Sequence, residues 1–152
     1  MKNQPTYDDA NLLLKLYDLR REETLREGRK WMGSMPAFTS REQWLAVCPP
    51  GSQENAYFRM VTTYWDMAAS FVVNGILNAE LFFRSNNLEM LYVWQKASGI
   101  IAETRKVQKN ELFLLNLEKV AASFIEFLGH QSPGYYEQFV ANIAKIQMPK
   151  KG

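Results

Sequence analysis

Apolar residues recur every three or four positions along most of the chain, the spacing that places them on one face of an α-helix. No segment shows the sustained alternation of apolar and polar residues that a half-buried β-strand requires. The sequence therefore predicts an all-α protein. The pattern is clearest in one stretch, at Tyr57, Met60, Val61, Tyr64, Ala68, Phe71 and Val72.

Capping residues divide this pattern into helices. Thr6 and Asp9 have the capping-box spacing, which predicts a long first helix that begins near Tyr7. Gly33 followed by Pro36 predicts its end. A short second helix is expected after Thr39 or Ser40, and the prolines and glycine at 49–51 end it. Ser52 predicts the start of a third helix, which Gly75 closes.

The second half of the chain shows four more helical segments. Asn78 predicts a brief fourth helix, and Asn86 or Asn87 predicts the start of a fifth, which ends near Lys109. A sixth helix is expected over 111–128, closed by Gly129. The pair at 132–133 predicts a seventh, which turns these side chains inward: Tyr136, Phe139, Val140 and Ile143.

The lengths of these segments predict how they are arranged. Four long helices with short connections favour an up-and-down bundle, with two or three short helices added to it, because short loops make neighbouring helices antiparallel. No repeat or linker divides the chain, so we expect one helical domain over residues 1–152, with loose ends at about 1–5 and 148–152.

Composition restricts the classes of function. A formal net charge of +2 gives no special attraction to nucleic acid or anionic lipid. The single Cys48 cannot form an internal disulfide, which favours a reducing, cytoplasmic location, and no signal peptide is apparent. The longest near-continuous apolar run, 67–73, is far shorter than the ~20 residues that span a membrane.

The residues for catalysis or metal binding are few. The single histidine, His130, follows Gly129 at the predicted end of a helix, where it is expected to cap the helix or lie on the surface. Its spacing from Glu126 is not the Glu-x-x-His spacing of di-iron bundles. Cys48 has no basic partner that the sequence identifies, and a buried free thiol is expected. The sequence predicts no enzyme, no metal and no cofactor.

One line of polar residues runs along the third predicted helix, and we call it the polar seam: Arg59, Thr62, Asp66, Ser70 and Asn74. The favoured interpretation is that the polar seam faces water or holds one contact between helices. Arg59 and Asp66 lie two turns apart, about 10 Å along the axis, too far for direct pairing. Asp66 is therefore expected to pair with an arginine of another helix, the candidates being Arg20, Arg21 and Arg105.

A second interpretation makes the polar seam the lining of a ligand pocket between the third, fifth and sixth predicted helices. Asp66 and Ser70 orient the ligand in that case, and aromatic side chains form the walls. These are Tyr64, Trp65, Phe71 and Trp94. Aromatic residues at helical spacing more often form a core, so this interpretation is the weaker one.

A DNA-binding arrangement is the third hypothesis. Residues 39–60 contain a short helix, a turn and a second helix, as in a helix-turn-helix. Two prolines in the turn oppose it, and Arg59 is the only cation early in the second helix.

Two segments, "LYDLRREETLREGRKW" and "YWDMAASFVVNGILNAELF", resemble an uncharacterised bacterial family of all-helical proteins with an Arg-rich first helix. The resemblance implies a helical fold without an established activity, and it transfers no catalytic residue. It also implies a carboxylate at the position of Asp66, in keeping with a structural role.

Together these observations predict a cytoplasmic helical interaction or scaffold module that self-associates or binds a protein partner. A small-molecule-binding bundle with an aromatic-lined pocket is the alternative. A helix-turn-helix DNA-binding regulator comes third.

Overall fold

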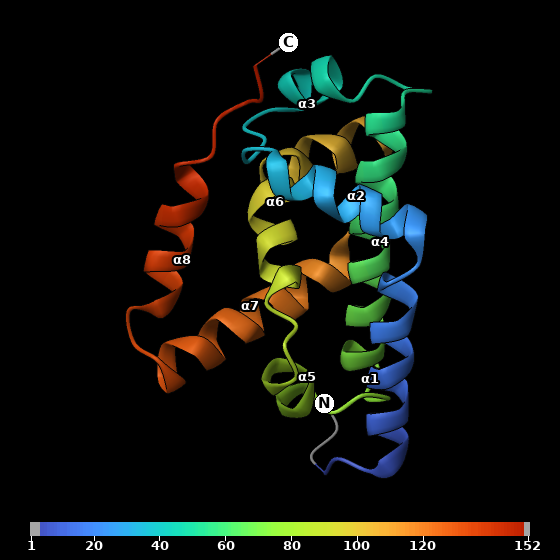
Figure 1. Cartoon of the computed structure of the whole chain (residues 1–152), viewed down its shortest axis with the longest axis vertical. Coiled ribbons are helices and arrows are strands. Elements are labelled where there is room, and N and C mark those ends of the chain that lie inside the picture. The colour runs from blue at the N-terminus through green and yellow to red at the C-terminus, as the bar shows by residue number, and fades with distance from the viewer. Residues whose placement is uncertain (1–3, 151–152) are drawn as a thin grey trace.

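The computed structural model describes residues 4–150, which form α-helices and no β-strand (Figure 1). The all-α prediction is confirmed. In chain order the helices are α1 (Tyr7–Arg20), α2 (Glu23–Ser34), α3 (Arg41–Val47), α4 (Gln53–Val73), α5 (Ala79–Arg84), α6 (Glu89–Gln108), α7 (Leu115–Gln131) and α8 (Tyr135–Ala144).

Helix α4 is the centre of the packing. It contacts α2, α6 and α7, and α6 also packs against α3, α7 and α8. Figure 1 shows α1 beside one half of α4, α2 turned across the other half, and α8 at the outer edge. The core between these helices holds large, fully buried side chains, among them Phe58, Trp65, Leu91, Leu117 and Phe124. The predicted up-and-down arrangement of four long helices is not confirmed.

Four predicted helix starts are confirmed by cap hydrogen bonds. Thr6 and Asp9 form the reciprocal capping box of α1. Ser40, rather than Thr39, caps α3, and Ser52 caps α4. Asn78 caps α5, where its side chain accepts the Leu81 amide at 2.8 Å. Each cap satisfies a backbone N–H that the first turn of a helix leaves without a partner.

The predicted long first helix is wrong, because the chain breaks it into α1 and α2. Glu22, between them, has φ −57° and ψ 140°, outside the helical region. Its carboxylate accepts the backbone N–H groups of Thr24 and Leu25 at 3.0 and 2.9 Å. These two bonds lower the pKa of Glu22. The break persists because Glu22 serves as the N-cap of a new helix.

Boundaries in the second half of the chain also differ from the prediction. The residue before α6 is Leu88, which has no side-chain cap bond, so neither Asn86 nor Asn87 is the N-cap. Helix α7 begins at Leu115 rather than at 111, after Leu114 in the left-handed region with φ 51°. It also continues past residue 129 to Gln131.

Helix α8 begins at Tyr135, later than its predicted start at 132–133, because Gly134 precedes it with φ 89°. Ile143 is buried as predicted, while the other three predicted inward side chains are half-buried. Of the predicted loose ends, residues 1–3 and 151–152 lie outside the described residues, and 4–5 and 148–150 are not helical.

Candidate functional site

Asp66 contacts the start of α7 rather than an arginine. Its carboxylate accepts the Leu117 backbone amide at 2.9 Å and the Asn116 side-chain amide at 3.3 Å. The predicted pairing with an arginine is wrong. Arg105 instead pairs with Glu118 at 2.5 Å, and Arg20 and Arg21 lie against other groups described below.

The other polar-seam residues do not converge on a common point. Thr62 is buried and donates to the Phe58 carbonyl of its own helix at 2.7 Å. Ser70 donates to the Met67 carbonyl at 2.6 Å. Asn74 donates to the Ser70 carbonyl at 2.8 Å, and Arg59 is exposed. Three of these side chains therefore donate hydrogen bonds to backbone carbonyls of α4, and the polar seam forms no shared ligand site.

The aromatic residues of the predicted pocket pack in the core. Trp65 is 1% exposed and Tyr64 is also buried, while Trp94 and Phe71 are half-buried against the same core. The Tyr64 hydroxyl donates to the Leu16 carbonyl at 2.5 Å, which ties α4 to α1. The hollows described below are lined by other residues.

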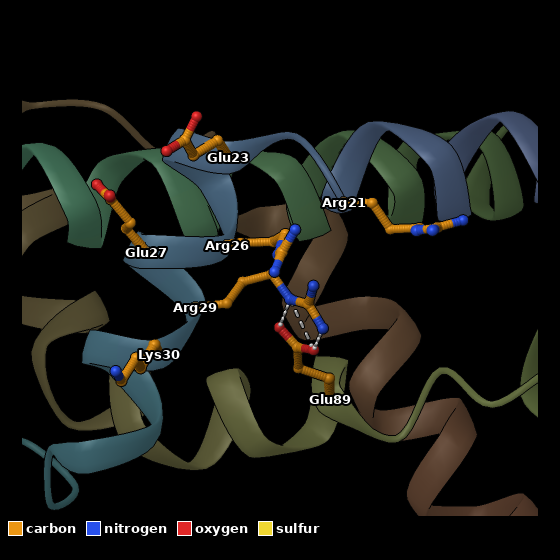
Figure 2. A pocket seen from close by; sticks show the side chains of 7 residues that line it. All are labelled: Arg21, Glu23, Arg26, Glu27, Arg29, Lys30 and Glu89. Carbon is orange, nitrogen blue, oxygen red and sulfur yellow. Dashed lines mark hydrogen bonds and ion pairs between the residues drawn. The ribbon is translucent and has the colours of Figure 1, made fainter.

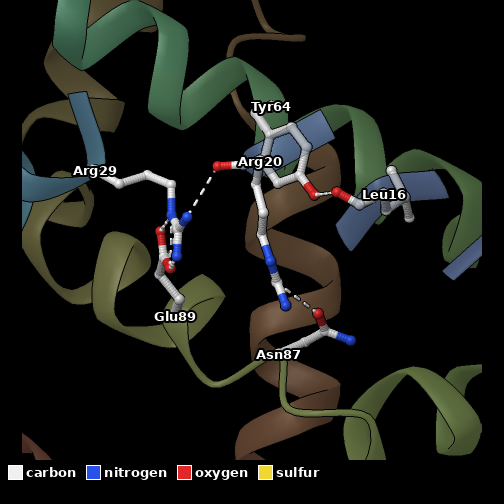
Figure 3. Close-up of polar contacts among 6 residues, drawn as sticks. All are labelled: Leu16, Arg20, Arg29, Tyr64, Asn87 and Glu89. Carbon is white, nitrogen blue, oxygen red and sulfur yellow. Dashed lines mark hydrogen bonds and ion pairs between the residues drawn. The ribbon is translucent and has the colours of Figure 1, made fainter. Parts of the chain in front are cut away.

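A cluster of charged residues joins α1, α2 and α6, and we call it the arginine junction: Arg20, Arg29 and Glu89 (Figure 3). Arg29 donates through Nε and Nη2 to the Glu89 carboxylate, with a shortest distance of 2.7 Å. Its Nη1 donates to the Arg20 carbonyl at 2.9 Å, at the last residue of α1. The bond to Glu89 raises the pKa of Arg29. Arg29 thus caps the end of α1 while its charge is neutralised at the start of α6.

Arg20 is the second arginine of this junction, and it turns inward with only 7% of its surface exposed. The rings of Tyr17 and Trp65 lie 5.1 and 5.3 Å from its guanidinium carbon, so both contact it by cation–π interaction. Its Nη1 donates to the Asn87 side-chain oxygen at 3.1 Å, and Asn87 donates in turn to the Phe82 carbonyl. Among the described residues, no carboxylate pairs with Arg20.

An apolar hollow of about 350 Å³ lies beside Arg20, and we call it the α1–α5 groove. One wall comes from α1 and the other from α5 and the residues after it. Leu14 and Tyr17 line it although they are 66% and 50% exposed. Its lining consists of Ala10, Leu13, Leu14, Tyr17, Arg20, Leu81, Ser85 and Asn87. Of these only Arg20 carries a charge, so the groove is apolar along its length and cationic at one place.

A larger and more polar hollow of about 700 Å³ lies beside Arg29 and Glu89 of the arginine junction (Figure 2). Its lining consists of Arg21, Glu23, Arg26, Glu27, Arg29, Lys30 and Glu89. Arg29 and Glu89 neutralise each other within it, and the remaining five side chains are exposed. Exposed charges of both signs interact weakly in water, so this hollow has the character of a solvated surface around one ion pair.

The residues with reactive side chains are placed without partners for chemistry. Cys48 is fully buried, and burial raises the pKa of its thiol to about 12, so it is not a thiolate at neutral pH. His130 is exposed in the last turn of α7. Among residues 4–150, no three His, Cys, Asp or Glu side chains gather where they could hold a metal ion.

The two helices of the DNA-binding hypothesis are present as α3 and α4. A recognition helix has to offer its side chains to a groove of DNA. Helix α4 instead packs against α2 and α7, with Phe58, Val61 and Trp65 in the core. None of the helices in the described part of the chain combines the length and apolar character that crossing a lipid bilayer requires.

The sequence held a signal for the α1–α5 groove. Residues 12–14 are three consecutive leucines, and Leu16, Tyr17 and Leu19 follow, so α1 is apolar on more than one face. Leu16 alone of these is buried. An apolar helix that uses one face for the core leaves a second apolar face available, and the α1–α5 groove lies on that face.

These features define an all-helical domain whose surface carries an apolar groove next to a buried arginine. The chain belongs to the family described as Domain of unknown function (DUF4760), whose model matches residues 5–124. The match therefore covers α1 to α6 and most of α7, including the arginine junction and the groove. No curated protein and no solved structure matches the chain.

Proposed function

We propose that this protein binds a small apolar molecule in the α1–α5 groove. The observation that carries the proposal is the exposure of Leu14 and Tyr17 on the wall of a hollow of about 350 Å³. Ligand sites in proteins are concave, largely apolar and about 300–1,000 Å³ in volume, with a few polar groups that orient the ligand. The groove has this character, with Arg20, Ser85 and Asn87 as its polar groups.

The test is binding of a neutral apolar probe, 1-decanol, followed by thermal unfolding. A ligand that binds the folded state alone stabilises it by an amount that grows with the logarithm of its concentration above Kd. We expect 1-decanol to raise Tm in the unmodified protein and to lose this effect in Leu14→Glu, which places a charge on the wall of the groove. Because Leu14 is 66% exposed, this substitution leaves the core intact.

Leu112→Glu is the matched control, since Leu112 is 73% exposed and lies outside the groove lining. It keeps the response to 1-decanol if the groove is the site. Equal responses in both variants, or no response in the unmodified protein, contradict the proposal. Native mass spectrometry of the freshly purified protein adds a second readout, because a ligand retained from the cell appears as a mass that leaves on denaturation.

Self-association as a scaffold is the second candidate. It is favoured by apolar side chains that α1 exposes outside the groove lining, Tyr7 at 91% and Leu19 at 49%. Such residues form interfaces when a partner covers them. Sedimentation equilibrium of the unmodified protein and of Leu19→Glu tests this. A dimer that dissociates in Leu19→Glu supports the scaffold function, and a monomer at all concentrations contradicts it.

A further inference from the structure

We propose that the ligand of the α1–α5 groove is an acyl-chain carboxylate whose head group binds Arg20. This inference rests on the proposed function, because it names the chemistry of the molecule that the same groove holds.

The guanidinium of Arg20 has N–H donors that no described group of the protein uses. Tyr17 and Trp65 contact it by cation–π interaction, and Asn87 accepts one hydrogen bond at 3.1 Å. A guanidinium carries five N–H donors in one plane, and it binds a carboxylate through two parallel hydrogen bonds. The two rings and the amide orient the group, while no described group accepts a hydrogen bond from the other edge donors.

Charge complementarity favours an anion at this place. Arg20 is 7% exposed, and a buried charge without a counterion is costly. The neighbouring carboxylate, Glu89, is already engaged in the bidentate pair with Arg29. A ligand carboxylate supplies the missing counterion. One cation without a second to support it matches a single negative charge better than the doubly charged phosphate.

The dimensions of the groove favour a small amphipathic molecule over a protein segment. Its α1 wall extends from Ala10 to Arg20, which is about 15 Å along the helix axis. A stable protein interface buries about 800 Å² on each partner, which a wall of three helical turns does not offer. Leu13, Leu14 and Leu81 supply apolar contacts for an acyl chain that ends at Arg20.

The experiment compares decanoate with 1-decanol, which have the same chain length and differ in the head group. Isothermal titration calorimetry measures both affinities at about pH 7.5. A charge-assisted hydrogen bond contributes about 1.5–3 kcal/mol, so we expect decanoate to bind at least about tenfold more tightly.

Asn87→Asp is the sharpest variant, because it places a protein carboxylate against Arg20 where the amide oxygen now lies. We expect it to abolish the preference for decanoate and to leave 1-decanol binding in place. Arg20→Met removes the cation and has the same expected effect. Arg21→Met is the control, since Arg21 is exposed and does not line the groove. Far-UV circular dichroism verifies that each variant is folded.

The outcomes separate the two proposals. If neither compound binds, the proposed function fails and this inference fails with it. If both bind with equal affinity in the unmodified protein, the groove is a site for apolar ligands and the carboxylate inference is overturned. A preference for decanoate that persists in both Asn87→Asp and Arg20→Met overturns Arg20 as the anchor. If these variants do not fold, the comparison in the unmodified protein and loss of the preference at high salt decide the matter.

Discussion

Asp66, in the middle of α4, accepts the backbone amide of Leu117 at 2.9 Å, three residues after the N-cap of α7. The N-cap itself is Leu114, whose side chain cannot accept a hydrogen bond. The carboxylate therefore performs the capping function from another helix, and it lies at the positive end of the α7 dipole. The presence of Asp66 in an aromatic segment of α4 is thus explained by its role as a cap for the first turn of α7.

Removal of this carboxylate is expected to destabilise the protein without affecting the groove. Asp66→Ala leaves the first turn of α7 without its cap, which costs about 0.5–2 kcal/mol in the free energy of unfolding. Asp66→Asn keeps one acceptor and is expected to cost less. Urea denaturation measures both, with Ser70→Ala as a control within the polar seam. Reduced 1-decanol binding in a folded Asp66→Ala protein contradicts the structural role and revives a pocket at this position.

The ion pair of the arginine junction is expected to stabilise the contact between α2 and α6. Glu89→Gln removes the negative charge that faces Arg29, and both side chains of the pair are 27% exposed. Because the site is only partly screened by water, we expect a loss of about 1–3 kcal/mol in urea denaturation.

Glu80→Gln, in the exposed pair with Arg84, is the matched control for Glu89→Gln, since exposed i,i+4 pairs contribute less than about 0.5 kcal/mol. Similar losses in the two variants contradict a special role for the arginine junction.

Two glycines inside helices are expected to respond oppositely to alanine. A Cβ at Gly99 in α6 would overlap the Phe38 carbonyl oxygen, which is backbone and cannot move aside freely. The same segment is held there by a bond from the Phe38 amide to the Lys96 carbonyl at 3.0 Å. Gly99→Ala is therefore expected to destabilise the protein by more than about 2 kcal/mol, or to prevent folding.

Gly129 in α7 is the comparison, because a Cβ there meets nothing within 4 Å. Gly129→Ala lowers the entropy of the unfolded chain and is expected to stabilise the protein by about 0.5–1 kcal/mol. Thermal unfolding of the two variants measures the contrast. A neutral Gly99→Ala contradicts the close approach of residue 38 to α6.

Local signals in the sequence predicted the caps of four helices, because a cap depends on residues three positions apart. The break at Glu22 could not be predicted in this way, because glutamate is not among the usual N-cap residues. Its carboxylate reaches amides two and three residues on, as a cap does. Nothing local predicts that the helix ends there, because both flanking segments have good helical propensity.

The partners across the fold could not be read from the sequence. Asp66 bonds to an amide 51 residues away, at a helix start that carries no capping residue of its own. Arginine is rarely buried, so nothing in the sequence predicts the burial of Arg20. Tyr17 of the same helix contacts it, but the Trp65 ring and the Asn87 amide come from distant segments. Such groups meet only when the whole fold is formed.

The stability of the protein is expected to rise with pH because of Lys96. This residue is fully buried in α6, where it donates to the Met32 and Gly33 carbonyls at 2.6 and 3.1 Å and lies over the ring of Tyr92. Burial lowers the pKa of Lys96 to about 8, whereas a lysine in an unfolded chain titrates near 10.5. Between these values the unfolded state binds more protons than the folded state, so the free energy of unfolding increases with pH.

The neutral amine still has two N–H donors for the two carbonyls, so deprotonation keeps these contacts. We expect the difference in unfolding free energy between the unmodified protein and Lys96→Met to grow from about pH 8 to pH 9.5, by at most about 1.4 kcal/mol per pH unit. Urea denaturation at several pH values measures it. The range stops below the titration of tyrosine, because burial raises the pKa of Tyr64 to about 12 and loss of phenol protons from the unfolded chain acts in the opposite direction. A difference that stays constant over this range means that Lys96 has the same pKa in both states, and the ammonium is then stabilised fully by the end of α2 and the Tyr92 ring.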